Sequence, residues 1–401
     1  MTGLAYCDAK ARIYYDESVT PLADGGIVRE STLDELIPAP DGTVSMILPG
    51  RRPLSTIGPA GNRYALGTIL PAGYTRLLVP AFVKDRGAPD LPLFGYTFAC
   101  VVGDRLHVAA AKTDESEDWQ PRSFGPGELE STIAARLAVD SDSRVLRQVA
   151  LCSAEYGCFT AQNVFLERGE AALPVSPKCN ARCIGCISQL EPPATLPSPQ
   201  TRIAYESTAD ELARIGIHHL QRVEDGIVSF GQGCEGEPLL RSPVIAAAIE
   251  KIRAARVNGT INLNTNGSIT RALDRCIDAG LQAVRISLNS FRPATYAAYY
   301  RPLGYALDDV LESIRLAVRR GLRTSLNLLT HPGVTDDEEE LTATEAFLRE
   351  VPIAMVQTRT LNIDPGWYFD AVGRSRNPLG MRHAIATIRR LTTIGNFTHT
   401  H

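Results

Sequence analysis

The feature that most constrains the fold is a regular alternation of short apolar segments and amphipathic segments from about residue 170 onward. One amphipathic segment carries Leu307, Val310, Ile314 and Val318 at helical spacing and ends at Gly321. Strands that alternate with helices predict a parallel β-sheet covered by helices, because each parallel connection needs a crossover. The expected strands span residues 171–176, 227–230, 260–264, 283–288, 324–329 and 353–358.

Helix start signals support the same pattern. Thr208 followed by Glu211 predicts a capping box, and Ser242 followed by Pro243 predicts an N-cap and the first turn of another helix. Six strand–helix units over about 220 residues fit a partial (β/α)6 TIM-like barrel of the α/β class better than a complete eightfold barrel. In such a barrel the reactive groups lie at the carboxyl ends of the strands.

Residues 1–165 differ from the rest, with many Gly and Pro residues between short apolar runs. Segments 94–102 and 106–111 flank Gly103 and Asp104, which predicts a β-hairpin, and segment 74–82 predicts a further strand. We therefore expect two domains. A β-rich N-terminal module of unknown role takes residues 1–165, and a barrel core with a short C-terminal extension takes residues 166–401.

Charge and composition exclude several classes of partner and compartment. The net charge of −4 argues against a nucleic-acid partner, because proteins that bind a nucleic-acid backbone usually carry a basic excess. No run of eighteen apolar residues is present, so no membrane span is expected. The first residues lack the pattern of a secretory signal, and the nine dispersed cysteines do not predict a disulfide framework. These features predict a cytoplasmic protein.

The strongest chemical signal is a cysteine motif directly after the first expected strand of the barrel. Cys179, Cys183 and Cys186 fall in a loop that also carries Lys178 and Arg182. Three thiolates at this spacing suit three irons of a [4Fe–4S] cluster and leave the fourth iron open. A structural zinc site with a fourth ligand, or three core cysteines, are the alternative interpretations.

With this motif the sequence resembles the radical SAM superfamily over most of residues 170–365. Gly236, Glu237 and Pro238 follow the second strand and resemble the family's segment that meets the amine of S-adenosylmethionine (SAM). The resemblance implies a [4Fe–4S] cluster and SAM as cofactors. It also implies reductive cleavage of SAM to a 5′-deoxyadenosyl radical, which abstracts hydrogen from a substrate.

Later strand ends carry further polar residues that match the family's cofactor contacts. Asn264 and Asn266 occupy the turn after the third strand, while Arg285, Ser287 and Asn289 alternate along the fourth strand and share one face. The resemblance implies that the polar residues of the fourth strand hold the ribose and the carboxylate of SAM, with Arg285 on the carboxylate. Gln357 and Arg359 repeat the pattern on the sixth strand, and structural hydrogen bonding is the alternative role for each residue.

Three departures from the family pattern are visible. The position before the third cysteine, usually aromatic, is Gly185, so we expect adenine to pack against Ile184 or Val356 instead. Glu235 replaces the first Gly of the usual Gly-Gly-Glu triplet, and of the two carboxylates we expect Glu237 to face the cofactor. A Pro-rich loop at 191–200 either covers the barrel mouth or lies passively on the surface.

The sequence leaves alternatives for a second metal site, for the substrate and for the electron donor. Cys152, Cys158 and Cys234 are candidates for a second metal site, and His218 and His219 are expected to be structural. The substrate is expected to be a peptide, a protein or a small molecule, and the electron donor a flavodoxin or ferredoxin. A zinc-stabilised binding protein without redox activity and an RNA-modifying member of the family are the alternative functions.

Overall fold

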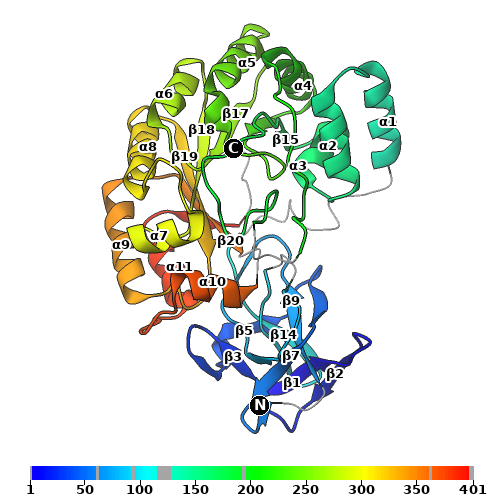
Figure 1. The fold of residues 1–401 in the computed structure, drawn as a ribbon, viewed down its shortest axis with the longest axis vertical. Coiled ribbons are helices and arrows are strands. Elements are labelled where there is room, and N and C mark those ends of the chain that lie inside the picture. Colours follow the sequence, from blue (N-terminus) through cyan, green and yellow to red (C-terminus); the bar gives the residue numbers. More distant parts are fainter. Residues whose placement is uncertain are drawn as a thin grey trace.

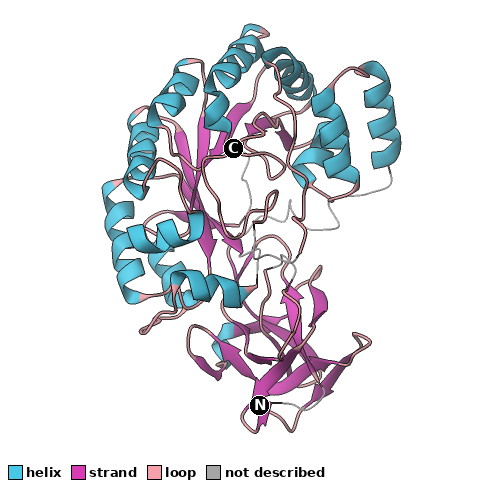
Figure 2. Ribbon diagram, in the orientation of Figure 1, coloured by secondary structure: helices cyan, strands magenta, loops and turns pink. Residues whose placement is uncertain are grey.

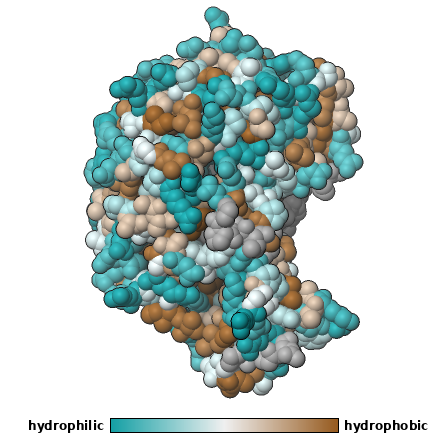
Figure 3. Space-filling view, in the orientation of Figure 1, coloured by the Kyte–Doolittle hydropathy of each residue, from teal (hydrophilic) through white to brown (hydrophobic). Residues whose placement is uncertain are grey.

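The computed structural model describes residues 2–59, 63–91, 95–114, 128–191, 196–360 and 364–396. The chain has two parts, a β-rich N-terminal part and a larger part in which helices surround a curled sheet (Figures 1 and 2). Hydrophilic side chains cover much of the visible face of the helical layer, and apolar side chains form scattered patches there (Figure 3). Among the described residues, no helix combines the length and apolar character needed to cross a membrane.

The larger part is built on a parallel sheet whose strands follow one another in sequence order, which confirms the predicted partial barrel. Its strands are β15 (Glu170–Ala172), β16 (Ile227–Phe230), β17 (Thr260–Thr265), β18 (Ala283–Leu288), β19 (Arg323–Thr330), β20 (Met355–Thr360) and β21 (Thr393–Gly395). The described sheet therefore has seven strands, where the sequence predicted six.

The first strand is shorter than expected for a physical reason. Residues 171–176 were predicted as a strand, but β15 ends at Ala172. The N–H groups of Val175 and Ser176 donate to the Glu235 carboxylate at 2.8 Å each, so they are not available to the next strand. The chain leaves the sheet there and becomes the cysteine loop.

Helices cover the outer face of the barrel, as the sequence predicted. They are α4 (Ala209–Arg222), α5 (Ser242–Ala254), α6 (Thr270–Asp278), α7 (Pro293–Tyr300), α8 (Leu307–Arg319), α9 (Glu338–Glu350), α10 (Pro365–Val372) and α11 (Met381–Arg389). The capping box of Thr208 and Glu211 is present at the start of α4. Ser242 is the first helical residue of α5, not its N-cap, which is Arg241.

The N-terminal part consists of short strands in three sheets. The largest sheet contains β1 (Thr2–Cys7), β2 (Ile13–Asp16), β5 (Leu36–Pro38), β6 (Val44–Leu48), β9 (Tyr64–Ile69), β10 (Tyr74–Arg76), β13 (Ala99–Val102) and β14 (Arg105–Lys112). Two smaller sheets contain β3 (Leu22–Asp24), β4 (Val28–Glu30) and β11 (Val79–Pro80), and β7 (Arg51–Ser55), β8 (Gly58–Pro59) and β12 (Phe82–Lys84).

Two local predictions in this part have different outcomes. The hairpin around Gly103 and Asp104 is formed by β13 and β14, although residue 94 of the expected hairpin lies outside the described residues. Segment 74–82 is not one strand, because its residues contribute to β10, β11 and β12 in three different sheets.

The β-rich character predicted for residues 1–165 does not extend to the end of that segment. Residues 129–166 form α1 (Leu129–Val139), α2 (Arg144–Ala154) and α3 (Phe159–Leu166). Helix α3 packs on β15 and α2 packs on α4, so these helices extend the helical layer of the barrel (Figure 1). Ser143 caps α2 by accepting a hydrogen bond from Leu146 N at 3.2 Å. The division at residue 165 stays a prediction.

The N-terminal part is joined to the barrel by buried polar contacts. Arg51 pairs with Asp364, the N-cap residue of α10, and the two side chains are 0% and 3% exposed. Thr75 on β10 and Thr358 on β20 share a hydrogen bond of 2.6 Å. Arg76 donates to Thr330 O at the end of β19 at 3.4 Å. A single apolar cluster also includes residues of both parts, so their cores are continuous.

We expect Asp364→Asn to lower the free energy of unfolding by about 3–5 kcal/mol, because it leaves the Arg51 charge buried without its partner. Asp85→Asn is the matched control, since Asp85 pairs with the neighbouring Arg52 and those side chains are 39% and 36% exposed. That change should cost less than about 1 kcal/mol. Urea unfolding followed by circular dichroism measures both, and equal losses would contradict the prediction.

Candidate functional site

The three cysteines of the motif line one cavity at the carboxyl edge of the parallel sheet. The cavity has a volume of about 410 Å³, and its wall contains Cys179, Cys183 and Cys186 together with Lys178 and Arg202. All three cysteine side chains are half-buried and free of disulfide bonds. The sequence motif therefore places its thiols around a common space that opens from the loop after β15.

The end of helix α7 holds one side of the cysteine loop. Arg182 N donates to Tyr300 O at 3.0 Å, and Ile184 N donates to Tyr299 O at 3.1 Å. Leu303 N donates back to Asn180 O at 2.8 Å. The last carbonyls of a helix have no partner within the helix, so they are available to fix the backbone of a loop.

The loop after β16 holds the other side. Gly236 N donates to Ser176 O at 2.7 Å, and Glu237 N donates to Lys178 O at 2.8 Å. A Cβ atom at Gly236 would lie 2.1 Å from Lys178 O and 3.0 Å from Cys179 N. Only glycine fits this contact, so the predicted motif residue Gly236 is explained by backbone packing against the cysteine loop.

Both acidic residues of this loop are buried and hydrogen-bonded within the chain. Glu235 accepts from the N–H groups of Val175, Ser176, Gly231 and Gln232 at 2.7–2.8 Å. Burial raises the pKa of Glu235 to about 7. The carboxylate therefore joins the beginning of the cysteine loop to the turn after β16.

Glu237, which the sequence predicted to face the cofactor, has internal partners on both carboxylate oxygens. It accepts from Leu239 N at 2.9 Å, from Asn266 N at 2.8 Å and from the Thr265 hydroxyl. Burial raises its pKa to about 7. Pro238 occupies the first turn of the short 3-10 helix Pro238–Arg241 that Glu237 caps. A contact from Glu237 to SAM stays a prediction.

The predicted asparagines after β17 separate into two environments. Asn266 donates to Asn180 Oδ1 in the cysteine loop at 2.8 Å, so it connects the two loops. Asn264 faces the barrel interior, where its Oδ1 accepts from Arg285 at 3.1 Å. Gly231, at a φ of +81°, allows close approach to Asn264, whose carbonyl oxygen would lie 1.8 Å from an added Cβ.

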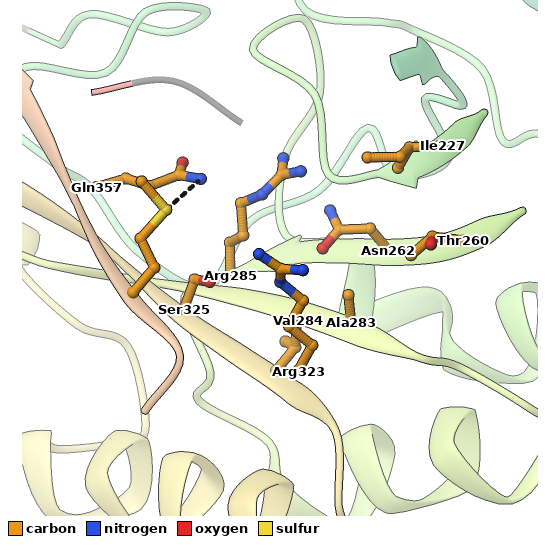
Figure 4. A pocket seen from close by; sticks show the side chains of 10 residues that line it. Ile227, Thr260, Asn262, Ala283, Val284, Arg285, Arg323, Ser325 and Gln357 are labelled. Atoms are coloured by element: carbon orange, nitrogen blue, oxygen red, sulfur yellow. Dashed lines mark hydrogen bonds between the residues drawn. The ribbon is translucent and has the colours of Figure 1, made fainter. Parts of the chain in front are cut away.

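The barrel interior is polar. Arg285 donates to Glu170 Oε1 at 2.7 Å, and their side chains are 9% and 2% exposed. Figure 4 shows Arg285 on β18 with Asn262 on β17 and Gln357 on β20, all lining a small cavity of about 30 Å³. Of the predicted polar residues of β18, Arg285 therefore faces the interior, and it already has partners within the chain.

Arg359 on β20 also reaches this interior, and it makes no ion pair within the described part of the chain. It donates to Gln357 Oε1 and Asn396 O at 2.7 Å each, and to Asn327 Oδ1 at 3.4 Å. Burial, with a smaller contribution from the Arg285 charge, lowers the pKa of Arg359 to about 10. Its guanidinium is held by neutral acceptors only.

The remaining predicted contacts differ in their surroundings. Asn289 is 1% exposed and donates to Thr295 O and the Tyr368 hydroxyl, while its Oδ1 has no partner. Ser287 is half-buried on β18. Val356 is 1% exposed, and its contact with adenine stays a prediction. Gln357 and Met355 face the barrel interior, so the intervening Val356 faces the other way, into the apolar core.

Two features near the cysteines were missed by sequence reasoning. Arg202 donates to Cys186 Sγ at 3.3 Å, and no periodic pattern distinguishes it in the sequence. Trp367 on α10 lines a second cavity, of about 310 Å³, together with Cys183 and Ile184. The only signal for Trp367 was an aromatic residue in a Pro-initiated helix after the last predicted strand.

The donor set fits an iron–sulfur cluster. Burial raises the pKa of Cys179 to about 11 and raises that of Cys183 well above its ordinary value, and the neighbouring thiolates add to both shifts. Three thiolates in this loop therefore need a strongly positive partner such as bound iron. In the described ranges, no three His, Cys, Asp or Glu side chains, those of the motif included, converge on a single ion position. A second metal site at Cys152, Cys158 and Cys234 stays a prediction.

Comparison with known proteins gives a family match. Residues 173–345 match the family model described as the radical SAM superfamily. The chain is 28% identical over 217 residues to human molybdenum cofactor biosynthesis protein 1, covering 53% of this chain and 31% of that protein. It is 29% identical over 202 residues to the GTP 3′,8-cyclase of Alkaliphilus metalliredigens (strain QYMF), covering 49% and 58%. The chain thus spans about a third to under two thirds of these relatives.

A solved structure is also similar. The crystal structure of methylornithine synthase aligns with a TM-score of 0.40 and 14% sequence identity, covering 67% of this chain and 69% of that one.

We expect Gly236→Ala to destabilise the fold by about 1–3 kcal/mol and to lower the iron bound after reconstitution, because the new Cβ displaces the backbone of Lys178 and Cys179. Gly233→Ala in the same loop is the control, since its Cβ meets the end of the flexible Gln200 side chain at 2.8 Å. Urea unfolding and iron analysis test the pair, and normal iron content in the Gly236 variant would refute the role of this contact.

Proposed function

We propose that this chain, which belongs to the radical SAM superfamily, is an enzyme that reductively cleaves SAM at a [4Fe–4S] cluster held by Cys179, Cys183 and Cys186. The observation that carries the proposal is the common cavity lined by all three thiols, inside the segment that matches the family model. When bound, the cluster and SAM supply hydrogen-atom abstraction from an unreactive carbon of the substrate.

The chain's own residues would position the cofactors. The backbone of Gly236 and Pro238, together with Glu237, lies beside the cysteine loop and would hold the amine of SAM. The unpartnered Oδ1 of Asn289 supports a contact with a ligand donor such as a ribose hydroxyl, because a buried polar atom without a partner is costly. Asn264, Asn266, Arg285 and Ser287 complete the proposed set. For Arg285, the bond to Glu170 supports a positioning role.

Shielding from water would come from buried aromatic residues behind the cysteine loop. Tyr296 stacks on Tyr300 at a centroid distance of 4.5 Å, and Tyr299 contacts Tyr300 at 5.0 Å and Tyr368 at 5.7 Å. Trp367 and Ile184 line the cavity next to Cys183. We propose that Trp367 takes part in covering the bound cofactors, in a position where the loop itself has Gly185.

For the substrate, the barrel interior supports a small molecule with an anionic group. The Arg359 guanidinium has only neutral hydrogen-bond acceptors in the described residues, with Glu170 and Asp114 acting on it from farther away, and an anion is a suitable complement. Relatives named GTP 3′,8-cyclase make a nucleoside triphosphate a specific candidate. A peptide or protein substrate, with the β-rich N-terminal part as its docking element, is the alternative, and an RNA substrate is less supported by the net charge of −4.

The reaction also needs an electron donor, and we propose a small redox protein of the flavodoxin or ferredoxin type. The cavity of the three cysteines has Lys178, Arg182 and Arg202 in its wall, which suits an acidic partner surface.

The central test uses protein purified without oxygen and reconstituted with iron and sulfide. With dithionite and SAM, we expect 5′-deoxyadenosine, detected by mass spectrometry, and its loss in Cys183→Ala. Cys100→Ala is the control, because Cys100 is a fully buried thiol of the N-terminal part. Colourless protein that binds zinc and no iron would refute the proposal and favour the zinc-stabilised binding protein.

The substrate class has its own test. We expect GTP to increase 5′-deoxyadenosine formation by the reconstituted protein and to be consumed, because its phosphates would complement the Arg359 guanidinium. Guanosine, which has the same base and no phosphate, is the control. Equal effects of the two compounds would refute recognition of an anionic group.

A further inference from the structure

The guanidinium of Arg202 lies at a position that the backbone fixes between the two loops of the site. Gln200 N donates to Ile187 O in the cysteine loop at 3.1 Å. Ile203 N donates to Cys234 O in the loop after β16 at 2.8 Å. The returning end of the Pro-rich segment is therefore tied to both loops, and residues 192–195 of that segment lie outside the described residues.

All three nitrogen groups of the Arg202 side chain have a partner in the cysteine loop. One terminal nitrogen donates to Cys186 Sγ at 3.3 Å, Nε donates to Ser188 Oγ at 3.1 Å, and the other terminal nitrogen donates to Gln189 Oε1. Ser188 in turn donates to Glu235 O at 3.3 Å. No carboxylate pairs with Arg202 in the part of the chain that the structure describes, so its positive charge is directed at the sulfur.

The other cations of the cavity have no such contact. Arg182 is 57% exposed on its side chain and pairs with Glu191 at 3.8 Å. Lys178 is exposed.

We propose that Arg202 is a positioning residue that donates a charged hydrogen bond to the Cys186 ligand and raises the reduction potential of the cluster. The proposal rests on the proposed function, since it requires the cluster. Hydrogen bonds to ligand sulfur and nearby positive charge stabilise the form of a cluster with more electrons. One electron from the donor enters the cluster, and Arg202 stays protonated throughout.

The experiment is a redox titration of the reconstituted protein, followed by electron paramagnetic resonance of the reduced cluster. We expect Arg202→Gln to shift the reduction equilibrium about tenfold toward the oxidised form, which is 59 mV for a one-electron couple. Arg202→Lys keeps the charge but lacks the planar fork that reaches Cys186 and Ser188 together, so we expect a smaller shift in the same direction.

Arg182→Gln is the matched control, because it removes an equal charge from the wall of the same cavity without removing a contact to sulfur. Its shift should be clearly smaller than that of Arg202→Gln. Equal shifts, or an unchanged potential in Arg202→Gln, would overturn the proposal. If Arg202→Gln folds normally by circular dichroism but holds no iron, Arg202 has a structural role and the tuning role is also refuted. Wild-type protein without iron would instead refute the proposed function.

Discussion

The buried carboxylate of Glu235 is the interaction on which the arrangement of the site depends. Its two oxygens accept four backbone N–H groups, two at the start of the cysteine loop and two in the turn after β16. Hydrogen bonds to an ionised group are the strong ones, and these four offset part of the cost of removing the charge from water, although burial still raises the pKa of Glu235 to about 7. This carboxylate ends β15, starts the cysteine loop and places Gly236 against Lys178. The three thiols can share one cavity because these loops have a single relative position.

Much of the barrel could be predicted because its signals are local. Apolar residues recur at helical spacing in each amphipathic segment, and the cysteine motif lies within eight residues of chain. The face of the sheet on which a strand residue lies depends on the register of that strand. Val356 and Gln357 are consecutive residues, and their side chains therefore point to opposite faces. The seventh strand, Thr393–Gly395, has three residues, which is too short for a recognisable pattern. Arg202 lies in a segment without periodicity, and its role follows from contacts with Cys186 and Ser188.

The relation between the two parts of the chain could not be derived from sequence, because it depends on pairs of residues far apart in the chain. Arg51 and Asp364 are 313 positions apart, and neither has a local feature that indicates burial. Arg76 is fully buried with the carbonyl groups of Tyr96 and Thr330 as acceptors, and burial lowers its pKa to about 10. The Arg51–Asp364 pair opposes separation of the two parts of the chain, because a buried charge that loses its partner is uncompensated.

The charges of the cysteine loop and of two nearby arginines suit the proposed chemistry. Thiolates crowded into one loop are unfavourable by themselves, as the raised pKa values of Cys179 and Cys183 indicate. Bound iron would supply most of the compensating charge, and Arg202 supplies a fixed cation at the third thiol. Arg359 presents a second cation to the barrel interior through neutral acceptors. Both cations are held by hydrogen bonds to uncharged acceptors or to sulfur and not by a direct ion pair in the described residues, so the site suits negative groups on the cluster side and on the substrate side.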